Sequence, residues 1–365
     1  YRLGSPVKFT ATIVMDDDES HELQSPTTRF CAGILDYIGS RPLHQQRPAA
    51  SCVFAMLTPK SLLRLATPPY LFQPLQVFRR LRLEYFWRSK NEALVLLPWG
   101  LPIKINPQEA VGHEIAAQGV YEREVTETLW RLTDPGDLAI DVGANIGYTT
   151  SILGVRVGPK GQVHSFEPHP QVFQSLSENV ARWQRDARCG VFIPHQSALG
   201  QESGSALLRT DDWFNTNRGT AWISEEKETA ANQQVCEVPM QKLDSIFASN
   251  EAIGIVKMDV QGHELGVLQG MSRLLECRAV RDIVFEEEKP FPAPTHQFLK
   301  TFGYSIFGLQ GSFTSVQSLP DTQPASDPQW GPVPNYLATR DPVRALARLK
   351  PLLWRSFGFS KFLGN

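Results

Sequence analysis

Two carboxylates and two glycines near residue 141 have the types and spacing needed to hold a nucleoside. A short apolar run ends at Asp141, a turn containing Gly143 and Gly147 follows, and a second apolar run closes on Glu167. Glycine is favoured in such a turn because a side chain there would block close approach of a ligand to the backbone. Glu167 falls about where a ribose presents its paired hydroxyls. Residues 138–167 therefore predict one β–α–β unit that binds a nucleoside-containing ligand.

The glycine spacing distinguishes between two classes of such ligands. A nicotinamide dinucleotide site uses G-x-G-x-x-G, whereas Gly143 and Gly147 give G-x-x-x-G with Ala144-Asn145 after the first glycine. A diphosphate would meet a wider turn and the negative charge of Asp141. S-adenosylmethionine has no phosphate, and its ammonium and sulfonium groups are compatible with a nearby acid. Backbone N–H groups at the helix start can receive its carboxylate, and Glu167 its ribose hydroxyls.

A third acid, Asp259, ends a later apolar run. Open α/β sheets bind ligands at the carboxyl edge of the strands, so Asp259 is expected to lie at the same site. If such a ligand gave its methyl group to an alcohol, the reaction would need alignment of the reacting atoms and a base that takes the hydroxyl proton. Asp259 is the leading candidate for this catalytic role; its alternative role is to cap the next helix. His263 and Glu264 could serve instead, or could be structural.

No metal site is expected, because Asp259 has no pair of histidine or carboxylate partners at ligand spacing.

The elements that must position these residues alternate between strands and helices. The expected strands are 138–142, 162–167, 191–198, 253–260 and 281–286, followed by 304–309 and 336–339. Apolar stripes at helical spacing occur at Val125–Leu132, Val172–Trp183 and Leu268–Leu275. Such alternation predicts an α/β fold with a parallel sheet and helices on both faces.

Two further segments lie outside this alternation. Residues 94–105 contain two short apolar runs around Trp99-Gly100 and predict a small hairpin. Residues 200–236 are polar and rich in glycine and asparagine, and a connection of this length is often a lid or substrate loop.

Three sequence blocks resemble the signature blocks of the FkbM-type methyltransferases. They are Ile140–Tyr148, Phe166–Pro170 and Lys257–Glu264, and shorter matches include Gly119–Glu122. The resemblance runs from about residue 95 to residue 340. It implies a class I methyltransferase (Rossmann-like) fold with a mostly parallel seven-stranded sheet. It also implies transfer of the methyl group of S-adenosylmethionine, most often to a hydroxyl oxygen.

The resemblance further implies roles for individual residues. Those that would hold the methionine end of the cofactor are Asp141, Gly143, Asn145 and Gly147. Those that would bind the ribose and flank the adenine are Glu167, Pro168, Ser197 and Ala198.

One position departs from the family pattern: Gln261 stands where the block usually has glutamate. If that carboxylate polarises the acceptor in relatives, the chemistry here must depend on Asp259, His263 or Glu264. If it only packs or forms hydrogen bonds, glutamine could substitute for it.

Length and composition allow one large domain with extensions. The chain has 365 residues, of which 42% are hydrophobic, and its net charge of −2 gives no sign of nucleic-acid binding. Five scattered cysteines without a CxxC pair fit a reducing compartment. No apolar run reaches the roughly 18 residues that span a bilayer. We therefore expect a cytoplasmic protein.

We expect four parts along the chain. They are a weakly ordered tail at 1–50, a basic apolar helical extension at 51–93, the methyltransferase domain at 94–340 and a basic amphipathic tail at 341–365. Basic residues interleaved with apolar ones at 51–90 and 342–365 fit either peripheral contact with an acidic membrane or simple docking helices.

The sequence thus predicts an S-adenosylmethionine-dependent O-methyltransferase. Its acceptor would be a small-molecule or glycan hydroxyl, on a sugar, glycolipid or secondary metabolite. The alternative is a catalytically silent methyltransferase-like module that binds a partner, which Gln261 keeps open. A nicotinamide oxidoreductase is disfavoured by the glycine spacing. The acceptor's identity and the oligomeric state are left open.

Overall fold

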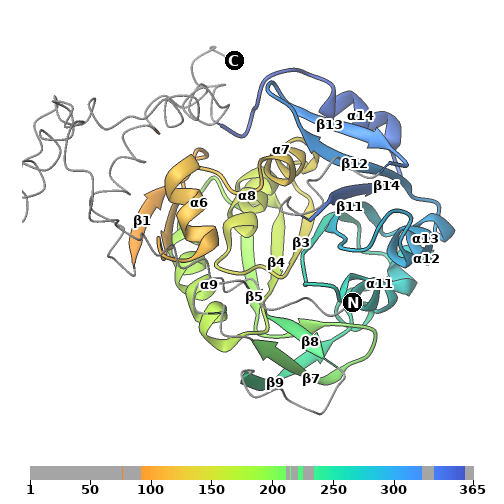
Figure 1. Cartoon of the computed structure of the whole chain (residues 1–365), viewed down its shortest axis with the longest axis horizontal. Helices are drawn as coiled ribbons and strands as arrows, with labels where there is room; N and C mark the ends of the chain where they lie inside the picture. Colours follow the sequence, from red (N-terminus) through yellow and green to blue (C-terminus); the bar gives the residue numbers. More distant parts are fainter. Residues whose placement is uncertain are drawn as a thin grey trace, which may run out of the picture. The chain divides into compact units, whose positions relative to one another are not determined.

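The computed structural model describes residues 92–210, 221–224, 234–322 and 333–357, together with Gln76 and Phe214 (Figure 1). All of them belong to the second of the two units into which the chain divides, residues 63–365. The expected tail at 1–50 and nearly all of the extension at 51–93 lie outside the described residues. The part of the chain that the structure describes contains no helix with both the length and the apolar character needed to cross a bilayer.

An eight-stranded sheet forms the centre of the domain. Its strands are, in spatial order, β13 (Val316–Pro320), β12 (Ser305–Gly311), β14 (Asn335–Thr339), β11 (Val280–Glu286), β10 (Ile253–Met258), β3 (Leu138–Val142), β4 (Gln162–Phe166) and β5 (Val191–His195). The pairings from β11 to β5 are parallel. β14 pairs antiparallel with β11 and β12, and β13 pairs antiparallel with β12.

The expected fold class is confirmed, and all the expected strands are present. The sheet has eight strands instead of seven because β13 forms within the connection between β12 and β14.

Alternate residues of the strands face two separate hydrophobic cores, as the two-residue period of a strand requires. Ala139, Ile255 and Val284 point into the first core, whereas their neighbours Ile140 and Val256 point into the second. The helices of the first core are α6 (Ala110–Gln118), α7 (Arg123–Leu132), α8 (Tyr148–Val157), α9 (Pro170–Trp183) and α14 (Pro342–Leu349). Those of the second are α10 (Leu243–Ile246), α11 (Glu264–Gln269), α12 (Ser272–Glu276) and α13 (Pro294–Thr301). Figure 1 shows α8 and α9 across the sheet from α11 and α13.

The expected hairpin at 94–105 is confirmed as β1 (Ala93–Leu96) and β2 (Pro102–Ile105). It packs on α9, where the Trp183 indole N–H donates to the Pro102 carbonyl over 2.6 Å. The Asn179 side chain accepts from the backbone N–H of Lys104 over 2.8 Å. These hydrogen bonds hold the hairpin against α9, and alternate residues of both of its strands are buried.

The expectation of a lid or loop at 200–236 is wrong for the residues of this segment that lie in strands, whereas residues 211–213, 215–220 and 225–233 lie outside the described residues. It contains β7 (Gly204–Thr210) and β8 (Trp222–Ser224), and β9 (Gln234–Gln241) begins in it. With β6 (Ala198–Leu199), these strands form a second, four-stranded sheet. Its small core contains Ala198, Ala206, Leu208 and Val238. Several polar residues of the segment 200–236 therefore lie in strands of this small sheet. A sheet with one exposed face needs few apolar side chains.

The C-terminal part folds back onto α7. After α14 (Pro342–Leu349), residues 350–357 run beside a buried ion pair of α7, in which Arg131 Nε lies 2.5 Å from Glu127 Oε1. The Arg131 guanidinium donates to the backbone carbonyls of Arg348, Leu349, Pro351 and Leu353. Glu127 accepts from the backbone N–H groups of Arg355 and Ser356. The Arg131 and Glu127 side chains of α7 thus form hydrogen bonds with the backbone of this segment, as a neighbouring strand would in a sheet.

The expected basic amphipathic character of this tail is therefore only partly available to a partner. Arg344 and Arg348 are both paired with Asp134, and Arg344 also lies 2.9 Å from Asp282. In contrast, the apolar side chains of Leu352 and Leu353 are exposed.

Candidate active site

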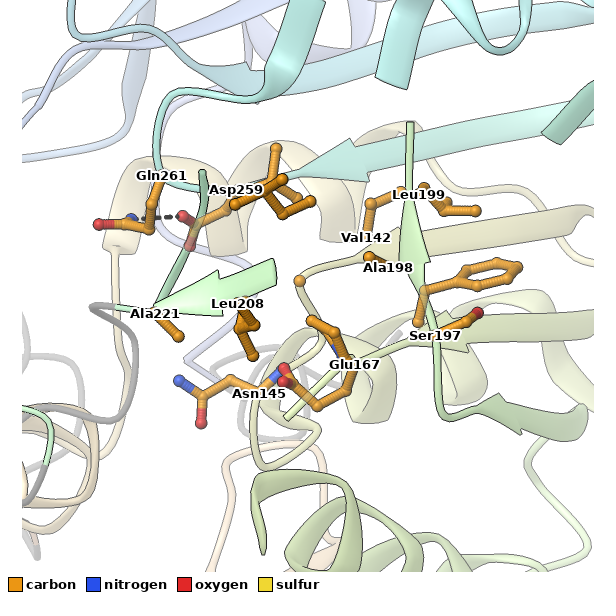
Figure 2. A pocket seen from close by; sticks show the side chains of 15 residues that line it. Val142, Asn145, Glu167, Ser197, Ala198, Leu199, Leu208, Ala221, Asp259 and Gln261 are labelled. Carbon is orange, nitrogen blue, oxygen red and sulfur yellow. Dashed lines mark hydrogen bonds between the residues drawn. The ribbon is translucent and has the colours of Figure 1, made fainter. Parts of the chain in front are cut away.

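A pocket opens at the carboxyl ends of β3, β4 and β10 (Figure 2). One wall comes from the strand ends and the loops after them: Val142, Gly143, Asn145, Phe166, Glu167, Pro168, Ser197, Ala198, Leu199, Asp259, Val260 and Gln261. The other wall comes from Leu208, Ala221 and Ile223 of the small sheet or next to it. The segment expected to be a lid therefore contributes an apolar wall through regular strands.

Glu167 is held at the end of β4 by two backbone donors. Its Oε2 accepts from Asn145 N over 3.0 Å, and its Oε1 accepts from His169 N over 2.9 Å. The side chain is buried, and this burial raises the pKa of Glu167 to about 7, although both backbone hydrogen bonds oppose the shift. Each carboxylate oxygen keeps a further lone pair, so the group can still accept two hydroxyl protons.

Ser197 and Ala198 lie where the chain passes from β5 into β6. The Ser197 hydroxyl is buried in the pocket wall and has no hydrogen-bond partner among the described residues. Buried polar atoms nearly always have a partner, so this hydroxyl is suited to meet a polar ligand. Pro168 lines the same pocket, so three of the residues expected at an adenine are brought together.

The two glycines of the turn are required by the packing of the chain itself. Gly143 has φ +73°, and a Cβ there would lie 1.9 Å from the carbonyl oxygen of Asp259. Gly147 has φ +91°, and a Cβ there would lie 2.8 Å from Leu176 and 3.1 Å from Trp183 of α9. Gly143 lines the pocket, whereas Gly147 lines neither this pocket nor the next.

A second pocket adjoins the first on the side of α6 and α7. Residues of the first half of the domain line most of it: Val111, Tyr121, Glu122, Val125, Thr126, Ala144, Ile146, Tyr148 and Thr149, with Lys257. Gly143, Asn145, Asp259 and Gln261 line both pockets. One elongated ligand can therefore extend from the first pocket past Asp259 into the second.

Tyr148, the first residue of α8, holds the loop that contributes Tyr121 and Glu122. Its hydroxyl accepts from Tyr121 N over 2.9 Å and lies 3.0 Å from Thr126 Oγ1, which donates to the Tyr121 carbonyl. Sequence reasoning did not select Tyr121, Glu122 or Thr149 as site residues. The signal that could have found the first two was their place in the Gly119–Glu122 match upstream of β3.

Lys257 is the buried cation of the site. Its Nζ lies 3.5 Å from Asp259 Oδ2 and 3.8 Å from Asp141 Oδ1, and donates to the Gly143 carbonyl over 3.3 Å. Burial lowers the pKa of Lys257, but Asp259, Asp141 and Glu122 outweigh this effect and raise it. Burial also opposes ionisation of Asp259, but Lys257 and hydrogen bonds to its carboxylate keep the pKa of Asp259 below its usual value. Asp259 is therefore ionised at neutral pH.

Asp141 lies beneath the turn rather than in a pocket wall. Its Oδ2 accepts from Thr150 Oγ1 over 2.6 Å, whereas its Oδ1 has no hydrogen-bond partner among the described residues. Burial raises the pKa of Asp141, and Lys257 opposes this shift.

His263 and Glu264 line neither pocket. Glu264 Oε1 accepts from the backbone N–H groups of Val260 and Gly262 over 3.1 and 3.3 Å. The His263 ring fills the space beside Gly200 and Gly266, where an added Cβ would lie 3.1 and 2.6 Å from its Nε2. Both residues hold the turn after β10. Among the described residues, no group of three or more His, Cys, Asp or Glu side chains could hold a metal ion.

The strand order and the site together define the class of protein. The last strand, β14, lies antiparallel between β11 and β12, and the ligand pocket lies where the strand order reverses between β3 and β10. This is the class I methyltransferase fold. Residues 141–306 match the family model described as the methyltransferase FkbM domain. Residues 141–306, less than half of the chain, are therefore similar to the FkbM-type methyltransferase domain that the sequence predicted, and this similarity supports S-adenosylmethionine as the cofactor.

Three relatives are similar to part of this chain. Hexuronic acid methyltransferase AglP of Haloferax volcanii is 31% identical over 157 residues, which are 42% of this chain and 58% of that protein. Methyltransferase sdnD of Sordaria araneosa is 25% identical over 206 residues, or 48% of this chain and 77% of that protein. The 31-O-demethyl-FK506 methyltransferase FkbM of Streptomyces tacrolimicus is 27% identical over 172 residues, or 42% of this chain and 65% of that protein. The chain thus spans less than two thirds of the first and third of these relatives.

Among solved structures, the methyltransferase FkbM of Methylobacillus flagellatus matches with a TM-score of 0.33 at 16% identity. The match covers 62% of this chain and 52% of that one. The fold assignment above rests on the strand order and not on this likeness.

Proposed function

We propose that the protein transfers the methyl group of S-adenosylmethionine to a hydroxyl oxygen of a sugar, glycolipid or secondary metabolite. The observation that carries this proposal is the junction of the two pockets, which share the ionised carboxylate of Asp259. A donor that spans both pockets brings its sulfonium next to this carboxylate.

The residues that would hold the donor fit its parts. Glu167 presents two fixed oxygens to the ribose hydroxyls, and the Ser197 hydroxyl and Pro168 face the adenine side. The second pocket would take the amino acid end, with Glu122 and Thr149 in its walls. Gly147 and Asp141 would act indirectly, by shaping and supporting the turn.

Methyl transfer is an in-line displacement, for which bound S-adenosylmethionine supplies an electrophilic methyl carbon and a neutral thioether leaving group. The chain's own task is to align the acceptor oxygen at roughly 3–3.5 Å from that carbon and to take its proton. Asp259 is the base we propose. It is a weak base, but the hydroxyl proton becomes strongly acidic as the new O–C bond forms. Lys257 keeps Asp259 ionised until the transfer begins.

The names of two relatives support the proposed acceptor classes. One acts on hexuronic acid, and another on 31-O-demethyl-FK506. A hydroxylated small molecule or glycan is the acceptor class that both names favour for this chain.

An acceptor screen with donor labelled in its methyl group tests the proposal. We expect label in a hydroxylated product, and at least a hundredfold loss of turnover in Asp259→Asn with donor affinity retained. Glu288→Gln, the same loss of charge on an exposed side chain, is the matched control. Donor binding without transfer to any acceptor would favour the silent binding module instead. Binding of NAD with no binding of S-adenosylmethionine would contradict the whole assignment.

Peripheral membrane contact through 342–365 also stays a proposal, supported by the exposed Leu352 and Leu353. We expect the full chain to float with vesicles containing phosphatidylserine. Replacing both leucines by aspartate should release it, and equal flotation of the variant would contradict this contact.

A further inference from the structure

Two acids lie level with each other at the ends of neighbouring parallel strands. Met258 of β10 and Phe285 of β11 are paired in register, and Asp259 and Glu286 are the next residues of each chain. Met258 and Phe285 both point into the second core, so by alternation the side chains of Asp259 and Glu286 project to the opposite face of the sheet, the side of α7 and α8. The sheet register therefore sets two carboxyl groups side by side at the junction of the pockets.

Gln261 joins these two groups. Its Nε2 donates to Asp259 Oδ1 over 3.0 Å and lies 3.4 Å from Glu286 Oε2, to which it also donates (Figure 2 shows the first bond). Gln261 adopts φ 53°, a left-handed conformation that is uncommon for residues other than glycine. An amide has two N–H donors and can satisfy both acids, whereas an ionised glutamate here would offer no donor and would add a further negative charge beside Asp259.

The surrounding charges make the two acids unequal. Lys257 lies beside Asp259, whereas Glu122 from the start of α7 and Glu264 from α11 face Glu286. Burial, followed by Asp259 and Glu122, raises the pKa of Glu286 to about 10. Burial likewise raises the pKa of Glu122 to about 8, with Asp259 and Glu114 adding to the shift and Lys257 opposing it. At neutral pH Glu286 thus carries a proton, which it shares in a hydrogen bond with ionised Asp259.

We propose that Gln261 and Glu286 are positioning residues that hold Asp259 ionised and oriented toward the acceptor hydroxyl. This inference rests on the proposed O-methyl transfer. In that step the acceptor O–C bond forms while the C–S bond breaks, and its electron pair stays on sulfur. The acceptor proton moves to Asp259, so the positive sulfonium and the negative carboxylate both become neutral.

Three substitutions separate positioning from packing. Gln261→Ala and Glu286→Ala each remove a donor to Asp259, so the acid limb of kcat/KM should move to higher pH by roughly one unit. Glu286→Gln retains an N–H donor and should restore the acid limb. It should also lose the alkaline limb that deprotonation of Glu286 causes near pH 10 in the native protein. Glu288→Ala, on an exposed neighbour, should leave the profile unchanged.

A second measurement does not depend on turnover. The side-chain carboxyl of Asp259 is titrated by carbon-13 NMR in the full chain, with the signal assigned by its loss in Asp259→Asn. We expect its midpoint to rise by roughly one pH unit in Gln261→Ala and in Glu286→Ala, and to stay in place in Glu286→Gln. Calorimetric binding of S-adenosylmethionine shows that each variant is folded.

The two readouts keep the two proposals apart. A shifted Asp259 midpoint in a protein that methylates no hydroxyl supports the positioning of Asp259 and overturns the proposed function. Methyl transfer with an unshifted midpoint and an unchanged pH profile in both alanine variants supports the function and overturns the positioning role.

Discussion

Replacing Glu167 by glutamine removes the group that we expect to hold the ribose. Both oxygens of Glu167 already accept backbone N–H groups, from Asn145 and His169. A glutamine can offer an oxygen to only one of them, and its NH2 group would face the other donor. The variant also loses the charge that strengthens bonds to the ribose hydroxyls, each worth about 1.5–3 kcal/mol.

Taking about 3 kcal/mol for the pair, because part of the loss is recovered by water, Kd for S-adenosylmethionine should rise roughly 100-fold. Isothermal titration calorimetry measures this, with Glu202→Gln on the exposed surface as the matched control. A fold intact by circular dichroism shows that the loss comes from the site.

The same carboxylate predicts how donor affinity depends on pH. We expect the ribose hydroxyls to donate to the ionised form, and burial raises the pKa of Glu167 to about 7. Affinity should therefore be full above this value and fall as pH drops through it, by about tenfold at pH 6. Glu167→Gln should abolish this dependence. Equal affinities of native protein and variant at pH 8, or an unchanged pH dependence in the variant, would refute the reasoning.

Two further predictions concern the frame around the site. Gly143→Ala should destabilise the fold by more than about 3 kcal/mol in urea unfolding, since its Cβ would collide with the Asp259 carbonyl. Gly136→Ala has a similar φ of +88° but open space around it, and should cost only about 1–2 kcal/mol; equal costs would contradict the collision. Trp354→Ala should cost about 3–5 kcal/mol and uncover Val120 beside the second pocket. A cost below about 1 kcal/mol would show that the C-terminal segment does not brace this region.

The parts of the site that lie within short stretches of sequence could be predicted. Glu167 and Asp259 each follow a largely buried strand and Asp141 is the penultimate residue of another, and parallel strands bring their carboxyl ends to one edge of the sheet. The alternation of strands and helices was therefore enough to predict that these three acids lie close together. Ser197 and Ala198, which follow β5, were predicted from the resemblance to the FkbM-type methyltransferases and not from this alternation.

The parts that depend on register or on distant segments could not be predicted. The pairing of Asp259 with Glu286 through Gln261 depends on the register of β10 with β11. Tyr121 reaches the site because the Tyr148 hydroxyl, 27 positions away, accepts its N–H. The glycines were assigned to ligand approach, but an added Cβ at Gly147 would first meet Trp183 and Leu176.

The small sheet was missed for a different reason. β7 and β8 are short and are separated by a polar stretch, so the segment that contains them resembles a polar loop in composition. Their contribution to the site, an apolar wall formed by Leu208 and Ile223, follows from tertiary pairing alone.

The structure of the full chain bound to S-adenosylmethionine would test the central claim most directly. We predict ribose hydroxyls within hydrogen-bond distance of both oxygens of Glu167, and the amino acid end beside Tyr121 and Thr149. The sulfonium should then lie at the junction of the pockets, next to Asp259. A donor bound with its ribose away from Glu167, or with its methyl group remote from Asp259, would contradict the account.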